Sequence, residues 1–353
     1  MTVSMDEMIQ RVVRYDDLIP CRTAFIDART PGSDRKENFT IIGPGVSENP
    51  GQHIHIKVPH GFNVGGARQP AGCVNSQHSH ETAEVFLVHS GVWAFRSGHD
   101  GTDGEVILHP GDVISIPVNV FRGFECLEGE DSFLFALLGG DDPGQVDWAP
   151  YVFEDAAGHG LVLTKAGRLI DTAIGETIPE GDEPCRPTMA GDVPRFRRLS
   201  SADLQAHVIA DAHAPLCAET TLAARASGVR EAPLLGPGNA CEAVAAGKVS
   251  SEHGFHFRKL VFGAGGTIPS HAREEREVVF VHRGAITIGW GDHAVTLTAG
   301  DTATLPEGLS RQWHADDKQG AVVFVVRGTD SPAPPRWAEQ AAHQAKGDLA
   351  AVV

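Results

Sequence analysis

The chain has 353 residues, among them 40 Gly and 22 Pro, and carries 29 Lys and Arg against 46 Asp and Glu, a net charge of −17. Such a charge argues against a nucleic-acid partner and against an anionic membrane surface, because both require a basic face. The sequence has no run of about 18 apolar residues, and its start lacks a basic segment followed by an apolar one. We therefore expect a cytoplasmic protein without a membrane span or a secretory signal.

The length is sufficient for two domains or for one large domain. Six cysteines are scattered along the chain without a C-x-x-C pair. This spacing excludes a zinc knuckle and a thioredoxin-type motif, and it predicts reduced thiols.

An internal repeat organises the chain. The pentapeptide IIGPG at Ile41 recurs as LLGPG 193 residues later, and at the same offset His78 matches His271 and Glu84 matches Glu277. A loop that is four residues longer in the first copy then reduces the offset to 189. At this second offset, the matched residues are Asp112 with Asp301, Arg122 with Arg311, and Trp148 with Trp337. The chain is therefore a tandem duplication.

Short apolar runs separated by Gly, Pro, Asp and Asn predict many strands in each copy, which is typical of a sandwich or barrel. The expected strands of the first copy cover 85–89, 92–96, 106–108, 113–116 and 133–138, and those of the second cover 278–281, 285–288, 294–297 and 321–326. A looser echo pairs VVRYDDL, from Val12, with VPRFRRL, from Val193. We expect a helix and a loop between the copies, and a terminal helix in the Ala-rich tail from Trp337.

A group of metal-binding residue types stands in the first copy, in the pattern Gly72-x(5)-His78-x-His80-x(3)-Glu84-x(6)-Gly91. The two His and the Glu are separated by even numbers of residues, so on an extended strand their side chains lie on one face. Their burial requires a partner, and a divalent transition metal accepts nitrogen and oxygen donors. Two His with one carboxylate is also the ligand set of non-haem Fe(II) oxygenases. The alternative is a solvated turn whose polar residues coincide by chance.

The segment 72–91 resembles the first motif of the cupin family, and Gly111-x(5)-Pro117 resembles the start of the second. With its duplication, the chain resembles a bicupin over 62–139 and 255–328. This resemblance implies an all-β protein with two tandem double-stranded β-helix (jelly-roll) barrels and a few peripheral helices.

The expected division of the chain is an N-terminal barrel over 1–150, a linker over 151–192 and a C-terminal barrel over 193–353.

The resemblance also implies that His78, His80 and Glu84 are three of four metal ligands, the fourth being a His five residues after Pro117. Arg122 occupies that position instead, and a protonated guanidinium cannot bind a metal. One interpretation is a structural arginine paired with a barrel carboxylate, as the equivalent Arg in the second copy suggests. The other is a catalytic arginine beside the metal that binds a carboxylate or enolate of the substrate bidentately.

The second copy departs further from the motif. His271 and Glu277 remain, but Arg273 replaces the second His and Arg311 stands at the position of the third. Two cations disfavour a bound metal. We therefore expect a structural or lapsed site, where an arginine pairs with Glu277 or holds an anionic ligand.

Other residues give weaker signals. The strand-like segment with His53, His55 and His60 supplies either a further ligand or pocket donor, or ordinary surface histidines. The expected apolar wall of the first barrel consists of Phe86, Trp93, Phe95, Phe121 and Phe135.

These patterns predict a metal-dependent enzyme, with a small acidic or enolisable organic molecule as the substrate of the N-terminal barrel. The first hypothesis is a non-haem dioxygenase with one divalent metal per chain, Fe(II) before Mn, Ni, Co, Cu or Zn. The alternatives are an isomerase, decarboxylase or lyase that uses the metal as a Lewis acid, and a non-catalytic small-molecule-binding bicupin. We also expect a homodimer, because sheet edges and apolar rims require cover.

Overall fold

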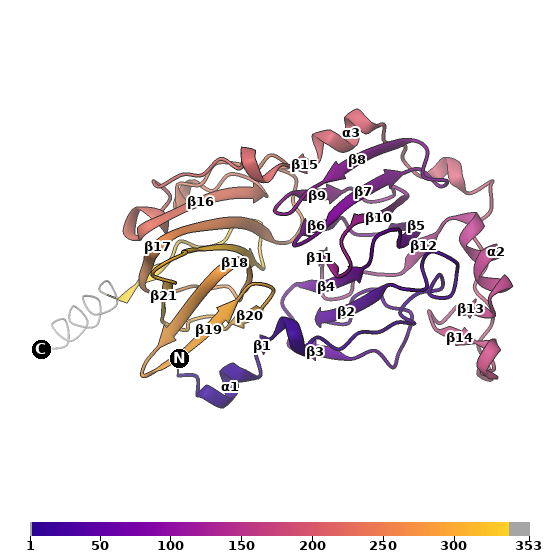
Figure 1. Ribbon diagram of the computed structural model, residues 1–353, viewed down its shortest axis with the longest axis horizontal. Coiled ribbons are helices and arrows are strands. Elements are labelled where there is room, and N and C mark those ends of the chain that lie inside the picture. The colour runs from indigo at the N-terminus through magenta and orange to yellow at the C-terminus, as the bar shows by residue number, and fades with distance from the viewer. Residues whose placement is uncertain (1, 339–353) are drawn as a thin grey trace, which may run out of the picture. The chain divides into compact units, whose positions relative to one another are not determined.

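The structure of the protein, a computed structural model, describes residues 2–338, which divide into two compact units (Figure 1). The N-terminal unit comprises 19–212, and the C-terminal unit comprises 2–18 together with 213–338. Each unit holds a β-barrel. The expected all-β fold with two tandem jelly-roll barrels and few helices is therefore confirmed. Of the tail for which we predicted a helix, residues 339–353 lie outside the described residues.

Two facing sheets form the N-terminal barrel. Its strands are β2 (Glu37–Ile42), β3 (Ile54–Ile56), β4 (Phe62–Gln69), β5 (Val74–His80), β6 (Glu84–Val88), β7 (Val92–Ser97), β8 (Gly104–Leu108), β9 (Val113–Ile116), β10 (Arg122–Glu128), β11 (Ser132–Gly139), β12 (Val146–Trp148) and β15 (Val208–Ile209). One sheet has the order β12-β5-β10-β7-β8, and the other has the order β15-β9-β6-β11-β4-β2-β3. Apolar side chains of both sheets, including Phe86, Trp93 and Phe124, pack together as the core.

The segment after the first barrel contains the helix that the sequence predicts there. Helix α2 (Pro150–Gly158) begins with proline, whose fixed φ suits the first turn. It is followed by a hairpin of β13 (Leu161–Leu163) and β14 (Leu169–Asp171) and later by helix α3 (Ser201–Ala206).

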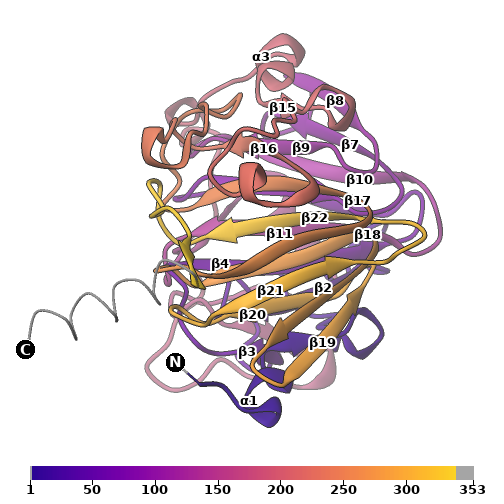
Figure 2. The same cartoon turned by 90° about the vertical axis from the view of Figure 1, so that its left-hand side faces the viewer.

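The C-terminal barrel is built from longer strands. It contains helix α1 (Met5–Ile9) and the strands β1 (Val12–Val13), β16 (Ser227–Leu235), β17 (His256–Ala272), β18 (Glu277–Trp290), β19 (His293–Thr298), β20 (Thr302–Leu305), β21 (Arg311–Ala315), β22 (Ala321–Arg327) and β23 (Arg336–Trp337). Because β17 and β18 each run through both halves of the barrel, the described strands of this unit join into one continuous sheet (Figure 2).

The strand register confirms the duplication residue by residue. In the first barrel Asn38 lies opposite Ala67, and in the second Glu231 lies opposite Leu260 at the same offset of 193. Equivalent residues of the two copies therefore occupy equivalent places in the two barrels. A residue in one barrel can be compared directly with its counterpart in the other.

A helix and a short strand from outside its own copy of the repeat complete each barrel. Those of the C-terminal barrel precede the first copy in the chain, and those of the N-terminal barrel precede the second copy. We call these segments the arms: the first arm is 4–15 and the second is 200–211. In the first arm, Ser4 caps α1, and β1 pairs with β20 of the C-terminal barrel. In the second arm, Ser200 caps α3, and β15 pairs with β9 of the N-terminal barrel.

The arms change two expectations from the sequence. The segment 193–199, expected to echo Val12 onward, holds a short 3-10 helix, and the counterpart of β1 is β15. The unit boundaries also differ from 1–150 and 193–353, because strand pairing assigns the first arm to the C-terminal unit and the second arm to the N-terminal unit. No sequence pattern indicates this exchange, since a two-residue strand is too short to show a periodicity.

One aspartate holds each arm against its barrel, the buried Asp301 in the C-terminal unit and the partly buried Asp112 in the N-terminal unit. The Asp301 carboxylate accepts hydrogen bonds from the backbone N–H of Tyr15 at 3.0 Å and of Thr298 at 2.9 Å. The equivalent Asp112 accepts from the backbone N–H of Asp211 at 2.8 Å and of His109 at 2.9 Å. The two arms are therefore held by the same contact.

We expect Asp301→Ala to lower the free energy of unfolding of the C-terminal unit by about 1–3 kcal/mol, because buried N–H groups lose their acceptor. Urea unfolding followed by tryptophan fluorescence measures this change. The exposed Asp292→Ala is the matched control and should leave the unfolding midpoint unchanged. Equal midpoints for both variants would show that the Asp301 contact contributes nothing to stability.

Candidate metal centre

The motif residues of the first copy converge at one end of the N-terminal barrel. His78 and His80 lie at the end of β5, and Glu84 opens β6 after a short turn. One ligand atom from each of the three side chains lies within 4.8 Å of the others, and all three residues are buried. The alternative of a solvated turn is therefore wrong.

The hydrogen bonds of His78 prepare its ring for metal binding. Its Nδ1 lies 2.7 Å from the carbonyl oxygen of Ser76, and since a carbonyl only accepts, Nδ1 carries the proton. Burial first, and the charge of Arg122 second, hold the pKa of His78 well below its usual range. The ring is thus neutral, and its Nε2 lone pair is available to a metal.

An aromatic contact fixes the position of the same ring. The indole of Trp148 packs 5.2 Å from the His78 ring, and its Nε1 donates a 2.6 Å hydrogen bond to Glu48. Glu48 is buried, and burial raises its pKa to about 8. The repeat identifies Trp148 as a matched residue, but no sequence pattern predicts this role. The signal was its match with Trp337, which packs 5.5 Å from His271 in the second barrel.

Arg122 opens β10 directly opposite His78. Its Nη2 donates a 2.6 Å hydrogen bond to Glu84 Oε2, and its Nη1 donates a 3.3 Å bond to the backbone oxygen of His78. The side chain is buried, and its Nε has no hydrogen-bond partner. This arrangement is the carboxylate pairing of the first interpretation of Arg122. A contact between Arg122 and a substrate stays a prediction.

Burial acts against the charges of both partners in this pair. It raises the pKa of Glu84 to about 8 and lowers that of Arg122 to about 9. At a separation of 2.6 Å the two opposite charges attract each other, and this attraction compensates part of that cost. Glu84 Oε2 also lies 3.4 Å from His80 Nε2.

The donor set fits a divalent transition metal. Two neutral imidazoles and a carboxylate are ligands that such ions accept, and His80 Nδ1 is a buried nitrogen without a hydrogen-bond partner. Donors around a metal bound at about 2.1 Å lie about 3 to 4 Å apart. The observed spread of up to 4.8 Å therefore requires only small side-chain rotations. Arg122 competes with the metal for Glu84.

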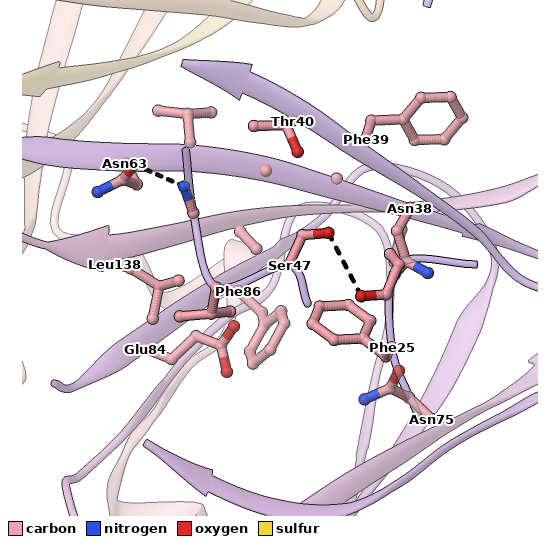
Figure 3. Close-up of a pocket in the computed structure, with 18 of the residues that line it drawn as sticks. Phe25, Asn38, Phe39, Thr40, Ser47, Asn63, Asn75, Glu84, Phe86 and Leu138 are labelled. Atoms are coloured by element: carbon pink, nitrogen blue, oxygen red, sulfur yellow. Dashed lines mark hydrogen bonds between the residues drawn. The ribbon is translucent and has the colours of Figure 1, made fainter. Parts of the chain in front are cut away.

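A pocket adjoins these residues (Figure 3). Its walls are mostly apolar, with amide and hydroxyl groups between the aromatic rings. Its lining residues include Phe25, Asn38, Phe39, Thr40, Ser47, Asn63, Asn75, His78, His80, Glu84, Phe86, Phe124 and Leu138.

Only part of the expected pocket wall is correct. Phe86 lines the pocket, whereas Trp93 and Phe95 pack in the barrel core and Phe121 packs against Phe196. Phe135 is buried and is not among the lining residues. The wall residues Phe25 and Phe39 were missed because they precede the motif and belong to no recognisable pattern.

The three additional histidines do not join this group. His53 and His55 pack against each other with their ring centres 4.5 Å apart, and His55 accepts a hydrogen bond from the backbone N–H of Ile19. The Nδ1 of His60 lies 2.6 Å from the backbone oxygen of Val58. None of the three is among the residues that line the pocket.

The equivalent place in the C-terminal barrel is filled by buried ion pairs. Glu277 accepts hydrogen bonds from Arg311 Nη2 and from Arg327 Nε, both at 2.7 Å. Arg258 pairs with Glu231 at 3.0 Å and also with Glu242. The expected pairing of an arginine with Glu277 is thus present in the structure.

Arg273, which replaces the second metal-binding His, also points into this network. It pairs with Glu242 rather than with Glu277. His271 remains close to the pairs, and burial with the charge of Arg311 lowers its pKa to about 3.

Three substitutions between the copies explain why one barrel has a pocket and the other has a charge network. Asn38, Gly65 and Leu138 line the pocket of the first barrel. At the matching register positions the second barrel has Glu231, Arg258 and Arg327. These larger charged side chains occupy the corresponding space, so the described C-terminal residues form a packed arrangement of ion pairs there.

Comparisons with known proteins agree with this fold. Residues 259–327 match the family described as the cupin domain. The structure resembles the oxalate decarboxylase–formate complex of Lactobacillus farciminis, with a TM-score of 0.54 and 11% identity over 94% of this chain and 88% of the other. A point mutant of Bacillus subtilis oxalate decarboxylase matches with a TM-score of 0.51 and 14% identity over 94% and 78% of the two chains.

The family match lies within the C-terminal barrel, and the likeness to the solved structures shows a bicupin-like fold. No curated protein sequence matches the chain. Among the described residues, no helix is long and apolar enough to cross a membrane.

The charge network should make the C-terminal unit sensitive to acid. Burial raises the pKa of Glu231, but the guanidinium groups of Arg258 and Arg327 outweigh burial and hold it at about 2, against an ordinary value of 4.5. Because the folded pKa is depressed, the stabilisation is complete above about pH 4.5 and is lost as the pH falls toward about 2.

Glu231→Gln should therefore flatten the dependence of stability on pH between about 4.5 and 2, as measured by thermal unfolding across that range. The exposed Glu219→Gln serves as the control. A Glu231→Gln protein that keeps the same acid dependence as the control would contradict this assignment.

Proposed function

We propose that the N-terminal barrel binds one divalent transition metal through His78, His80 and Glu84 and acts on a small enolisable organic molecule without consuming oxygen. The reaction class is that of an isomerase, decarboxylase or lyase. The observation that carries this proposal is the convergence of three buried donors beside a mostly apolar pocket. A bound metal would supply a Lewis acid that stabilises an enolate or carboxylate oxygen.

The chain's own residues would prepare the site. Trp148, held by Glu48, keeps the His78 ring in place, and Arg122 orients the carboxylate of Glu84. Phe86 and its neighbours exclude water, which strengthens each polar interaction with a bound molecule.

The dioxygenase that we expected first has less support than this reaction class. Two oxalate decarboxylases are among the solved structures that the fold resembles, and a decarboxylase belongs to the reactions without oxygen incorporation. Their low identity does not transfer their substrate to this chain. Oxygen consumption during turnover, measured with an electrode, distinguishes the two classes.

A non-catalytic binding protein is the second candidate. It is favoured by one observation, the ion pair between Arg122 and Glu84, because a carboxylate held by a guanidinium is a poorer metal ligand. The metal content of the purified protein decides between this candidate and an enzyme.

We expect one equivalent of metal per chain, measured by elemental analysis after gel filtration. His80→Ala should reduce the content to below about 0.1 equivalent, because two ligands hold a metal weakly. His271→Ala is the matched control, since it removes the equivalent of His78 from the charge-filled barrel. Loss of metal in the control, or two equivalents in the wild type, would contradict the asymmetry between the barrels.

Substitutions of Arg122 test its relation to Glu84. Arg122→His should raise metal affinity by about 10-fold or more, because it releases Glu84 and adds a fourth donor. Arg122→Lys should retain the metal yet weaken ligand binding if the guanidinium fork contacts the substrate. Competition with a chelator measures the first effect, and calorimetry measures the second. Unchanged metal affinity in the His variant would show that the ion pair does not limit metal binding.

The homodimer that we expect from the sequence is also a proposal. Light scattering over a hundredfold concentration range tests it, and a constant monomer mass would exclude it.

A further inference from the structure

The side chains that line the N-terminal pocket carry little charge beyond the candidate metal ligands. Among the described residues that line it, the remaining groups are aromatic rings, small or aliphatic side chains, amides and hydroxyls, without a Lys or an Arg. The buried Lys36 lies behind Asn75, and its amino group pairs with Asp27 and contacts the Asn75 amide oxygen at 3.0 Å. No cation of the described lining is thus available to a second negative group of a ligand.

In the C-terminal barrel, cationic side chains stand at positions where such a group could bind a second negative group of a ligand. Leu138 of the pocket corresponds to Arg327, and Gly65 corresponds to Arg258. The first barrel therefore has an aliphatic side chain and a glycine where the second has guanidinium groups. A ligand with two carboxylates would leave one of them among apolar groups, which is costly for an unpaired charge.

Asn38 offers a specific contact at the other side of the pocket. Its side-chain Nδ2 is buried and has no hydrogen-bond partner, and the residue lines the pocket (Figure 3). Asn38 lies on β2 and Glu84 on β6, and β11 and β4 lie between these strands. Three strand spacings place them about 14 Å apart along the sheet, so the pocket extends from the candidate metal ligands to an unused amide donor.

We propose that the substrate has one anionic or enolate head and an elongated, uncharged body of aromatic or aliphatic character, with a neutral oxygen at its far end. The head lies at His78, His80 and Glu84, the body lies along Phe86 and Leu138, and the oxygen accepts a hydrogen bond from Asn38. This inference rests on the proposed function, and it assigns Asn38 as a specificity-determining residue.

A series of 2-oxo acids that differ only at the far end tests the inference. Pyruvate has no body, phenylpyruvate has an aromatic body, 4-hydroxyphenylpyruvate adds a terminal oxygen, and oxaloacetate has a second carboxylate. We expect phenylpyruvate to bind at least about tenfold more tightly than pyruvate or oxaloacetate, because an aromatic ring is buried and no second charge is paired. Calorimetry with the purified protein, at its measured metal content, gives these affinities.

Two variants and one surface control make the test specific. The hydroxyl of 4-hydroxyphenylpyruvate should improve binding about five- to tenfold in the wild type, as expected for one buried hydrogen bond, and Asn38→Leu should abolish this gain while retaining phenylpyruvate binding. Leu138→Arg should shift the preference toward oxaloacetate, whereas Leu127→Arg on the surface should not. The Asn38→Leu comparison stands even if Leu138→Arg fails to fold.

Oxaloacetate binding as tight as phenylpyruvate, an undetectable affinity for phenylpyruvate, or a hydroxyl gain that survives Asn38→Leu would each overturn the inference. These outcomes are distinct from failure of the proposed function. A metal-free protein, or one that consumes oxygen, contradicts that function whatever the order of the affinities.

Discussion

A buried carboxylate paired with an arginine lies at the same place in both barrels. Glu84 with Arg122 and Glu277 with Arg311 each join the first residue of one strand to the first residue of another across the barrel. A buried charge requires such compensation. What surrounds the pair decides whether each barrel keeps room for a ligand.

In the first barrel the pair is surrounded by histidines, amides and aromatic rings, so the space beside it stays open. In the second barrel Arg327 takes the other oxygen of Glu277, and further ion pairs extend the network through Arg258. A few substitutions at matching register positions thus convert one duplicated scaffold into a pocket and a packed charged core. This division of roles is consistent with chemistry in the N-terminal barrel and a structural task in the other.

The sequence predicted those parts that depend on short-range pattern. The motif grouped His78, His80 and Glu84 correctly, but the expected single strand was wrong, because β5 ends at His80 and Glu84 opens β6 after a turn. The resemblance to the second cupin motif, five residues after Pro117, identified Arg122 as a residue of the same site. The expected place of Phe121 and Trp93 in the pocket wall was wrong, because alternation along a strand shows that a side chain is buried but not which cavity it faces. Asn38 was missed because its free amide depends on neighbours that are distant in the sequence.

The exchange of arms has a consequence for synthesis on the ribosome. Strand β15 follows its partner β9 by about 95 residues, whereas β1 precedes its partner β20 by about 290. At a translation rate of about 5 to 20 residues per second, roughly 15 to 60 seconds therefore separate the synthesis of the first arm from that of the strand with which it pairs. During this interval the partner of β1 within its own chain does not yet exist, so the C-terminal barrel can be completed only after the rest of the chain has been made.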